Sequence, residues 1–228
     1  TNQPLNSLPY PISITASNGE SILFTEAPKR IVAMDSAVVE ILYSMGEAWR
    51  LVGTHDFVTY PPETKDIPRV GGASNLNLEA IAGLNPDLVF VFSQSAADDL
   101  KQIDLKVLVL ESINDDYRKI SEHIRMWGQI IDKRDEAEKI AVDIDRRISK
   151  IETVMYDVSY SLSVFQDEGS LWTPGPDTLI GSVFNLLKLK NIAWDVSGYA
   201  MFNPEEILAR QPDIVVASYQ DDISTNPF

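Results

Sequence analysis

Residues 77–91 read NLEAIAGLNPDLVFV, and residues 203–217 read NPEEILARQPDIVVA. The second stretch follows the first by 126 residues, from Asn77 to Asn203, and both obey the pattern N-x-E-x-I-x-x-x-x-P-D-[LI]-V. In each copy the Asn can cap a short helix by accepting a hydrogen bond from its free N–H groups. The Pro cannot continue that helix, and the apolar run after the Asp predicts a buried strand. One helix–turn–strand unit therefore occurs in each half of the chain, which predicts two similar lobes with a cleft between them.

The bulk composition narrows the class of protein. A chain of 228 residues holds one large domain or two small ones. The net charge of −15 argues against nucleic acid or an anionic membrane as the main partner. The absence of Cys excludes disulfides, iron–sulfur clusters and thiol nucleophiles. No apolar run reaches the ~18 residues of a membrane span. The polar, Pro-containing start is typical of a tether or a processed N-terminus of an exported protein, although a cytoplasmic protein can also begin this way.

Strand and helix signals alternate along the rest of the chain. A hairpin is predicted at 12–24, where alternating residues surround Ser17-Asn18-Gly19. Further strands are predicted at 31–34, 51–53, 107–110 and 160–166, helices at 37–45 and 178–187, and a loop at 172–177. Such alternation predicts parallel sheets of βαβ units in both lobes, with ligands beyond the carboxyl ends of the strands.

A helical pattern separates the two halves from about residue 116 to residue 156. A break at 132–134 divides it, and Asp135 with Glu138 predicts an acidic capping box for the second helix. That helix should reach ~30 Å, so it can act as a stiff connector that permits little domain closure. The predicted division is an N-terminal lobe at 1–115, connecting helices at 116–156 and a C-terminal lobe at 157–228.

Several segments resemble one known family. The segments are APKRIVAMDSAVVEILYSMG (27–46), LVGTHDFVTYP (51–61), NLNLEAIAGLNPDLV (75–89), TPGPDTLI (173–180) and NPEEILARQPDIVV (203–216). Together they resemble the class III, helical-backbone substrate-binding proteins of ABC importers for ferric siderophores, haem and cobalamin. The resemblance implies two α/β lobes joined by a long rigid helix. It also implies a monomer at the periplasmic or extracellular face of the membrane, with lipid anchoring as one mode of attachment. Because the family's C-lobe continues past the position of Ser218, the C-lobe here is expected to be incomplete.

The two copies of the repeat contain the predicted docking residues. Glu79 and Glu205 hold the same place in the two copies. The resemblance implies that each meets an Arg on the permease subunits of the importer, and a carboxylate can pair with a guanidinium through two parallel hydrogen bonds. The alternative is that each acid only complements the helix dipole, worth ~0.3–1 kcal/mol. Glu206, and not Glu205, has the spacing that closes a capping box with Asn203.

The predicted ligand-binding residues lie on loops that follow the strands. They are Asp35, Ser36, His55, Phe57, Tyr60, Ser74 and Gln94 in the N-lobe, and Trp172 and Tyr199 in the C-lobe. Positions similar to Trp172 and Tyr199 carry ligand-stacking aromatics in the cobalamin-binding relative, because aromatic faces give large contact area at low entropy cost. Alternatively both aromatics simply pack the lobe. Ser74 replaces a Trp of that relative, and basic residues near the expected cleft are scarce. Neutral or cationic chelates are therefore favoured over anionic catecholates, and cobalamin itself is less favoured.

The two His residues do not build a metal centre. His123 falls in a connecting helix, and His55 alone cannot form the multi-ligand site that bare zinc needs. His55 or Tyr60 can at most offer one axial ligand to haem. The phosphate-loop, nucleophile-elbow and zinc-protease motifs are absent. The sequence therefore predicts a solute-binding protein without a catalytic site, a cofactor or a resident metal, whose ligand is a ferric siderophore or alternatively cobalamin, haem or a metal oxyanion. The rivals of another class are a tetrapyrrole metal chelatase that uses His55 and a surface interaction protein.

Overall fold

The computed structural model describes residues 10–72, 75–110, 115–160 and 162–217, which form an α/β protein. The chain divides into two compact units. Unit 1 contains Thr1–Ser112 and Ser121–Val142, and unit 2 contains Ile113–Ile120 and Asp143–Phe228.

A four-stranded parallel sheet in the order β4-β3-β7-β8 forms the centre of unit 1. Its strands are β3 (Ile31–Ala33), β4 (Leu51–Thr54), β7 (Leu88–Val91) and β8 (Val107–Val109). The hairpin is β1 (Ile12–Thr15) and β2 (Ser21–Phe24), and β5 (Gly71–Gly72) pairs with β6 (Asn75–Leu76). The helices of this part are α1 (Ser36–Ser44), η1 (Ala48–Arg50), η2 (Pro62–Asp66), α2 (Leu78–Gly83), α3 (Gln94–Lys101) and α4 (Lys119–Ile130). The predicted hairpin and the four predicted strands of the central sheet are thus confirmed. Because the four central strands are parallel, both faces of their sheet require helical cover.

Local sequence determines where β3 ends and where the following helix α1 begins, at the carboxyl end of the sheet. All three residues of β3 are buried, as expected for a central parallel strand. Asp35 ends the strand and caps α1, because its carboxylate accepts from the Ala37 N–H at 2.7 Å. Trp127 of α4 packs against the sheet, with its ring edge-on to the ring of Phe90 in β7 at 5.5 Å between centroids.

Unit 2 has a smaller parallel sheet in the order β11-β9-β13. Its strands are β9 (Ser163–Asp167), β11 (Lys190–Asn191) and β13 (Ile214–Ala217), and its helices are α6 (Leu179–Leu186) and α7 (Pro204–Arg210). A second, antiparallel pair joins β10 (Trp172–Pro174) to β12 (Tyr199–Met201). The prediction of a loop at 172–177 was therefore wrong for its first half. The Pro and Gly residues there indicate a loop locally, but β12, which follows α6 in the chain, supplies the pairing partner.

The two copies of the repeat fold alike. The Asn77 side chain accepts from the Ala80 N–H at 2.9 Å, and the Asn203 side chain accepts from the Glu206 N–H at 2.7 Å. The Asp87 carboxylate accepts from the backbone of Lys29 and Arg30, just before β3 (2.7 and 3.0 Å). In the other copy the Asp213 carboxylate accepts from the backbone and the hydroxyl of Ser163, at the start of β9 (2.7 and 2.8 Å). Each Asp thus ties the incoming strand to its parallel neighbour, and the predicted helix–turn–strand units are confirmed.

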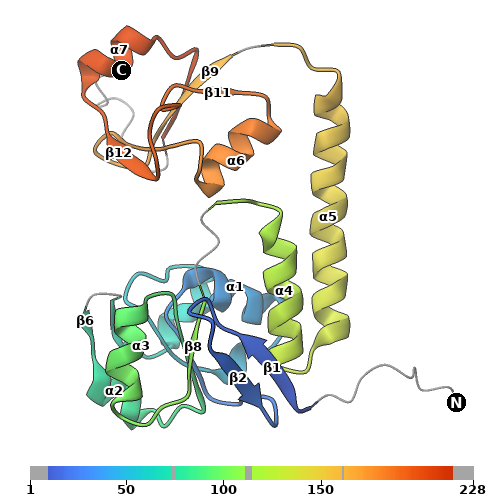
Figure 1. Ribbon diagram of the computed structural model, residues 1–228, viewed down its shortest axis with the longest axis vertical. Helices are drawn as coiled ribbons and strands as arrows, with labels where there is room; N and C mark the ends of the chain where they lie inside the picture. Colours follow the sequence, from blue (N-terminus) through green and yellow to red (C-terminus); the bar gives the residue numbers. More distant parts are fainter. Residues whose placement is uncertain (1–9, 73–74, 111–114, 161, 218–228) are drawn as a thin grey trace, which may run out of the picture. The chain divides into compact units, whose positions relative to one another are not determined.

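The long connecting helix is α5 (Arg134–Tyr156), a single helix of 23 residues in Figure 1. It is about 35 Å long at 1.5 Å per residue. Its first part, up to Val142, belongs to unit 1, and the rest belongs to unit 2. The capping box predicted for Asp135 was wrong, because the helix already begins at Arg134 and Asp135 lies within its first turn.

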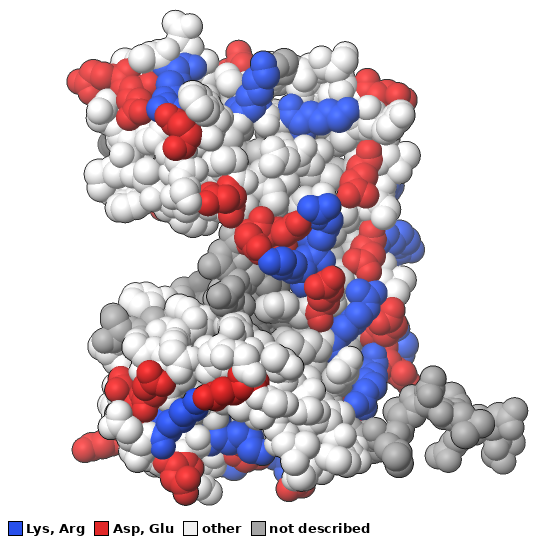
Figure 2. Space-filling model, in the orientation of Figure 1, with Lys and Arg blue, Asp and Glu red and all other residues white. Residues whose placement is uncertain are grey.

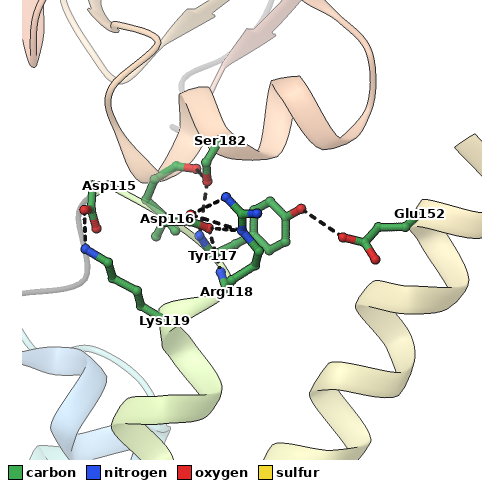
Figure 3. Close-up of polar contacts among 8 residues, drawn as sticks. Asp115, Asp116, Tyr117, Arg118, Lys119, Glu152 and Ser182 are labelled. Atoms are coloured by element: carbon green, nitrogen blue, oxygen red, sulfur yellow. Dashed lines mark hydrogen bonds and ion pairs between the residues drawn. The ribbon is translucent and has the colours of Figure 1, made fainter.

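The segment before α4 is anchored in unit 2 by polar contacts (Figure 3). The Tyr117 N–H donates to the Ser182 hydroxyl of α6 at 3.2 Å, and the Tyr117 hydroxyl donates to Glu152 of α5 at 3.4 Å. Arg118 pairs with Asp116 within the same segment at 2.6 Å. These contacts explain why residues 113–120 group with unit 2 although the rest of α4 packs on the sheet of unit 1.

Candidate functional site

Predicted ligand residues of unit 1 gather where neighbouring parallel strands end. Ser36 follows β3 and His55 follows β4, and these strands are adjacent in the sheet. The Ser36 hydroxyl and the His55 Nε2 lie 3.1 Å apart, within hydrogen-bond distance. Asp35 is half-buried, and its carboxylate caps α1. The carboxyl edge of this sheet therefore brings Asp35, Ser36 and His55 together, in the position where α/β sheets bind ligands.

The hydrogen bonds of His55 indicate its tautomer. Its Nδ1 accepts from the Phe57 N–H at 3.3 Å, so the ring proton of the neutral form lies on Nε2 and can be donated to Ser36. Burial lowers the pKa of His55, and the nearby Arg69 lowers it further, while the carboxylates of Asp35 and Asp56 oppose this shift. His55 is therefore held neutral near pH 7, and it can offer a ligand one polar ring without a charge.

Two aromatic residues follow His55 and lie largely in solvent. Phe57 is 77% exposed and Tyr60 is 63% exposed. The Phe57 ring is tilted against the His55 ring, with 6.3 Å between centroids. Arg69, which sequence reasoning missed, holds this loop by donating to the carbonyls of His55 and Val58 at 3.3 and 2.9 Å. A lone Arg on a polar stretch gives no signal from which this contact with a loop 14 residues earlier can be predicted.

The other two candidates of unit 1 do not join this group. Gln94 is the first residue of α3, and its side chain is engaged by Asn18 and Asp98 at 2.9 and 2.7 Å. No hydrogen bond between Gln94 and the Ser36–His55 pair occurs among the residues that the structure describes. Ser74 lies outside the described residues.

The two aromatic candidates of unit 2 share one face of the β10–β12 pair. Trp172 lies opposite Met201, and Pro174 lies opposite Tyr199. Residues two apart on a strand point to the same side, so Trp172, Tyr199 and Met201 line one face while Thr173 points into the core. The three side chains are 42%, 48% and 60% exposed. We call this surface the aromatic face. Sequence reasoning missed Met201, although the alternation Tyr199-Ala200-Met201 would have placed it there once a strand was assigned.

An acidic side chain neighbours the aromatic face. Burial raises the pKa of the Tyr199 hydroxyl, and the neighbouring carboxylate of Glu168 raises it further. Elsewhere on the molecule acidic and basic side chains alternate on the face drawn in Figure 2. Much of the basic side-chain charge is paired locally, as with Arg125 and Glu138 at 2.8 Å or Arg147 and Asp143 at 2.7 Å. The aromatic face thus combines exposed apolar area with one neighbouring carboxylate.

A groove of about 470 Å³ in unit 2 lies apart from these candidates. It is lined by Tyr117, Arg118, Glu152, Met155, Tyr156, Ser182, Asn185, Leu186 and Lys188. None of the predicted ligand residues belongs to this lining. Its charged side chains are engaged, since Lys188 donates to the carbonyls of Tyr156 and Val158 at 2.7 and 3.0 Å.

The predicted docking residues occupy equivalent, exposed positions. Glu79 lies in the first turn of α2, and Glu205 lies in the first turn of α7. Within the described part of the chain neither carboxylate has a hydrogen-bond or ion-pair partner. Glu206, by contrast, pairs with Arg210 at 2.7 Å. Each copy of the repeat thus presents one carboxylate that is available to an outside partner.

The described residues form neither a metal-ligand cluster nor a membrane-spanning helix. No group of three or more His, Cys, Asp or Glu that could hold a metal ion occurs among them. None of the described helices is both long and apolar enough to cross a membrane.

The amino-acid sequence of this chain is similar to the sequences of known binding proteins. A family model described as periplasmic binding protein matches residues 31–228. The chain is 26% identical over 219 residues to an uncharacterized ABC transporter substrate-binding lipoprotein, YvrC, of Bacillus subtilis, covering 92% of this chain and 69% of that protein. It is 25% identical over 222 residues to the cobalamin-binding protein of Halobacterium salinarum, covering 93% of this chain but only 60% of that protein.

A solved structure supports the fold. The structure of an ABC-type Fe³⁺-hydroxamate transport system from Saccharomonospora viridis superimposes with a TM-score of 0.75 at 20% identity, covering 93% of this chain and 81% of that chain. At this identity the likeness shows the fold alone. The matched family consists of binding proteins, so the prediction that the chain is not an enzyme is confirmed, and the chelatase alternative is set aside. The family match covers most of the chain and confirms the resemblance seen in its motifs: the chain belongs to the periplasmic binding protein family.

Proposed function

We propose that this protein captures a metal chelate outside the cytoplasm and delivers it to the permease of an ABC importer. The observation that carries the proposal is the repeated helix start, which presents one unpaired carboxylate in each unit, Glu79 and Glu205. A pair of equivalent acids suits a permease with two equivalent basic sites. The names of the relatives support the same class, since they include an ABC transporter lipoprotein and a cobalamin-binding protein.

The ligand is a chelate of low negative charge, a ferric hydroxamate siderophore or cobalamin. The aromatic face of Trp172, Tyr199 and Met201 offers flat and polarizable area to such a ligand. In unit 1, neutral His55 and exposed Phe57 offer similar chemistry. A strongly anionic catecholate would meet the neighbouring carboxylate of Glu168 at the aromatic face. The continuous helix α5 supports the prediction of a small closure, which a wide lobe rotation between crystal structures with and without ligand would contradict.

The test is a binding titration with four probes: a ferric hydroxamate, a ferric catecholate, haem and cobalamin. Quenching of Trp fluorescence reports binding, but its source must be assigned, because Trp49 and Trp194 are exposed as well as Trp172, while Trp127 is fully buried. A Trp172→Phe variant is the control that assigns the signal. Saturation at 100 times Kd should add ~2.7 kcal/mol of stability, which a thermal-shift scan detects independently.

Each result of the titration supports or contradicts the proposed ligand class. Tight response to the hydroxamate or to cobalamin, lost in Trp172→Phe fluorescence but kept in the thermal shift, supports the proposal and names the cargo. Preference for the catecholate contradicts the electrostatic argument. Preference for haem moves the ligand to a planar macrocycle with His55 or Tyr60 as the axial candidate. Silence to all four probes contradicts the proposed ligand class and favours an oxyanion or a protein partner.

A further inference from the structure

The carboxylate of Asp177 joins the two strands that carry the aromatic face. It follows β10 by three residues, and its Oδ1 accepts from the Gly198 N–H at 2.8 Å. Its Oδ2 accepts from the Ser197 hydroxyl at 2.7 Å. Gly198 immediately precedes Tyr199, the first residue of β12. One side chain therefore links the end of one strand to the start of the other.

The backbone at this junction is tightly packed. The Gly175 N–H donates to the Gly198 carbonyl at 2.7 Å, which extends the β10–β12 pairing by one bond. A Cβ on Gly175 would lie 2.3 Å from the Val196 carbonyl oxygen, so this approach requires Gly. Asn191 adds a hydrogen bond to the Pro174 carbonyl at 2.7 Å. The segment 174–177 thus has a defined position against 196–199.

A second carboxylate holds the opposite end of the strand pair. Asp167 is 3% exposed, and its Oδ1 accepts from the N–H groups of Gly169 and Leu171 at 2.8 and 2.9 Å. These bonds shape the tight turn that leads directly into Trp172, in which Ser170 and Leu171 have φ of 53° and 63°. Trp172 is therefore fixed from one end by Asp167, and Tyr199 is fixed from the other end by Asp177.

We propose that Asp177 is a positioning residue for ligand recognition, which holds Tyr199 and Met201 in register with Trp172 before the ligand arrives. A two-stranded pair of three residues per strand is marginal by itself, so it needs such side-chain bonds. A face that is already ordered loses less conformational entropy on binding and binds more tightly. This inference rests on the proposed function, because it takes the aromatic face as the ligand contact. Asp177 itself does not touch the ligand.

The test combines two measurements on Asp177→Ala, which removes both hydrogen bonds, on Ser197→Ala and on a matched control. Asp195→Ala is the control, because Asp195 is an exposed carboxylate of unit 2 that pairs with Arg210 and not with the strand pair. Hydrogen exchange followed by mass spectrometry measures order in peptides covering 172–178 and 196–201, with peptides from β9 as the reference. The titration with the four chelates measures affinity.

We expect Asp177→Ala to speed exchange in both strand-pair peptides, to leave β9 protected and to weaken binding of the preferred chelate about tenfold. Ser197→Ala should show a smaller change of the same kind, and Asp195→Ala should show neither. Unchanged exchange in Asp177→Ala, or faster exchange with unchanged affinity, would overturn the inference. Faster exchange throughout β9 in both Asp177→Ala and Ser197→Ala would also overturn it, since Asp177 would then support the whole unit. If the wild type binds none of the four chelates, the proposed ligand class fails, while the exchange data still decide whether Asp177 orders the strand pair.

Discussion

The two copies of the repeat have nearly the same local structure and very different burial. In both copies an Asn caps the helix, a residue with φ of 47° precedes the Pro, and an Asp binds the start of the neighbouring strand. Yet Val89 of β7 is fully buried, whereas Val215, at the same place in β13, is 44% exposed.

The difference lies in the neighbours of the strand and not in the strand itself. β7 is paired on both sides, by β3 and β8, and its four residues are all buried. Within the described residues β13 is paired by β9 alone. Hydrogen bonds inside the repeat therefore specify its local shape, while the burial of its strand depends on elements that are distant in the sequence.

The largest expected effect concerns the two carboxylates that the copies present to the outside. We expect the double variant Glu79→Gln with Glu205→Gln to reduce chelate uptake by reconstituted permease vesicles at least 100-fold, and each single variant about tenfold. A lost charge-assisted hydrogen bond is worth ~1.5–3 kcal/mol, which gives factors of this size. Chelate affinity of the isolated protein should not change.

Glu206→Gln is the matched control, because Glu206 is already paired with Arg210. Uptake with this variant should be close to wild type. If one single variant were as inactive as the double variant and the other fully active, the two copies would not be equivalent in docking.

The next effect tests burial at identical residues. Val89→Ala should lower the free energy of unfolding by about 2–3 kcal/mol, because it removes buried methyl groups and leaves a cavity. Val215→Ala should change it by less than ~0.5 kcal/mol, as expected of an exposed site. Urea unfolding followed by circular dichroism measures both. Equal losses would show that β13 is covered in solution.

A pH series tests the Asp that ties each strand to its neighbour. The backbone N–H of Ser163 and then its hydroxyl hold the pKa of Asp213 below its ordinary value of 3.8. A lowered pKa means that the stabilisation is fully present above the ordinary value and is lost as the pH falls through the lower folded value. The wild-type thermal midpoint should therefore fall as the pH is lowered through 3.8 and below, and the midpoint of Asp213→Asn should fall less steeply. An identical slope in both proteins would remove Asp213 from this account.

The smallest effect concerns the left-handed residue before each Pro. Asn85 and Gln211 both have φ of 47°, a conformation that Asn tolerates and Gln does not. Gln211→Gly should stabilise the protein by ~0.5–1 kcal/mol, whereas Asn85→Gly should be nearly neutral. Thermal unfolding of the two variants against wild type measures the difference. Equal shifts would show that the strain at Gln211 is already relieved by its surroundings.

Much of the fold follows from patterns within a few residues. The caps at Asn77 and Asn203, the hairpin at 12–24 and the buried strands of unit 1 were all predictable. The strand β10 was not, because its partner β12 lies beyond α6 and the local signal of Pro and Gly indicates a loop. The capping box at Asp135 failed for a smaller reason, since α5 begins at Arg134, two residues before the first helical position that an Asp135 cap would give.

Some residues of the candidate site were predicted from the sequence and others were missed. Sequence and resemblance placed Ser36 and His55 at strand ends, and the sheet order brought them within hydrogen-bond distance. Arg69, Met201 and Asp177 were missed, because each acts through a partner that is distant in the chain or through a strand pairing.

Most helix starts and the buried strands of unit 1 follow from the order of the amino acids, because caps, prolines and apolar runs act through contacts between residues close along the chain. The sequence also determined family membership, through motifs that keep their order. Only the tertiary structure decided which equivalent residues are buried, which carboxylates stay unpaired, and which side chains share a face. Burial and pairing depend on the whole arrangement of neighbours, so Val89 in β7, which is paired on both sides, is buried, while Val215 in β13, which the described residues pair on one side, is exposed.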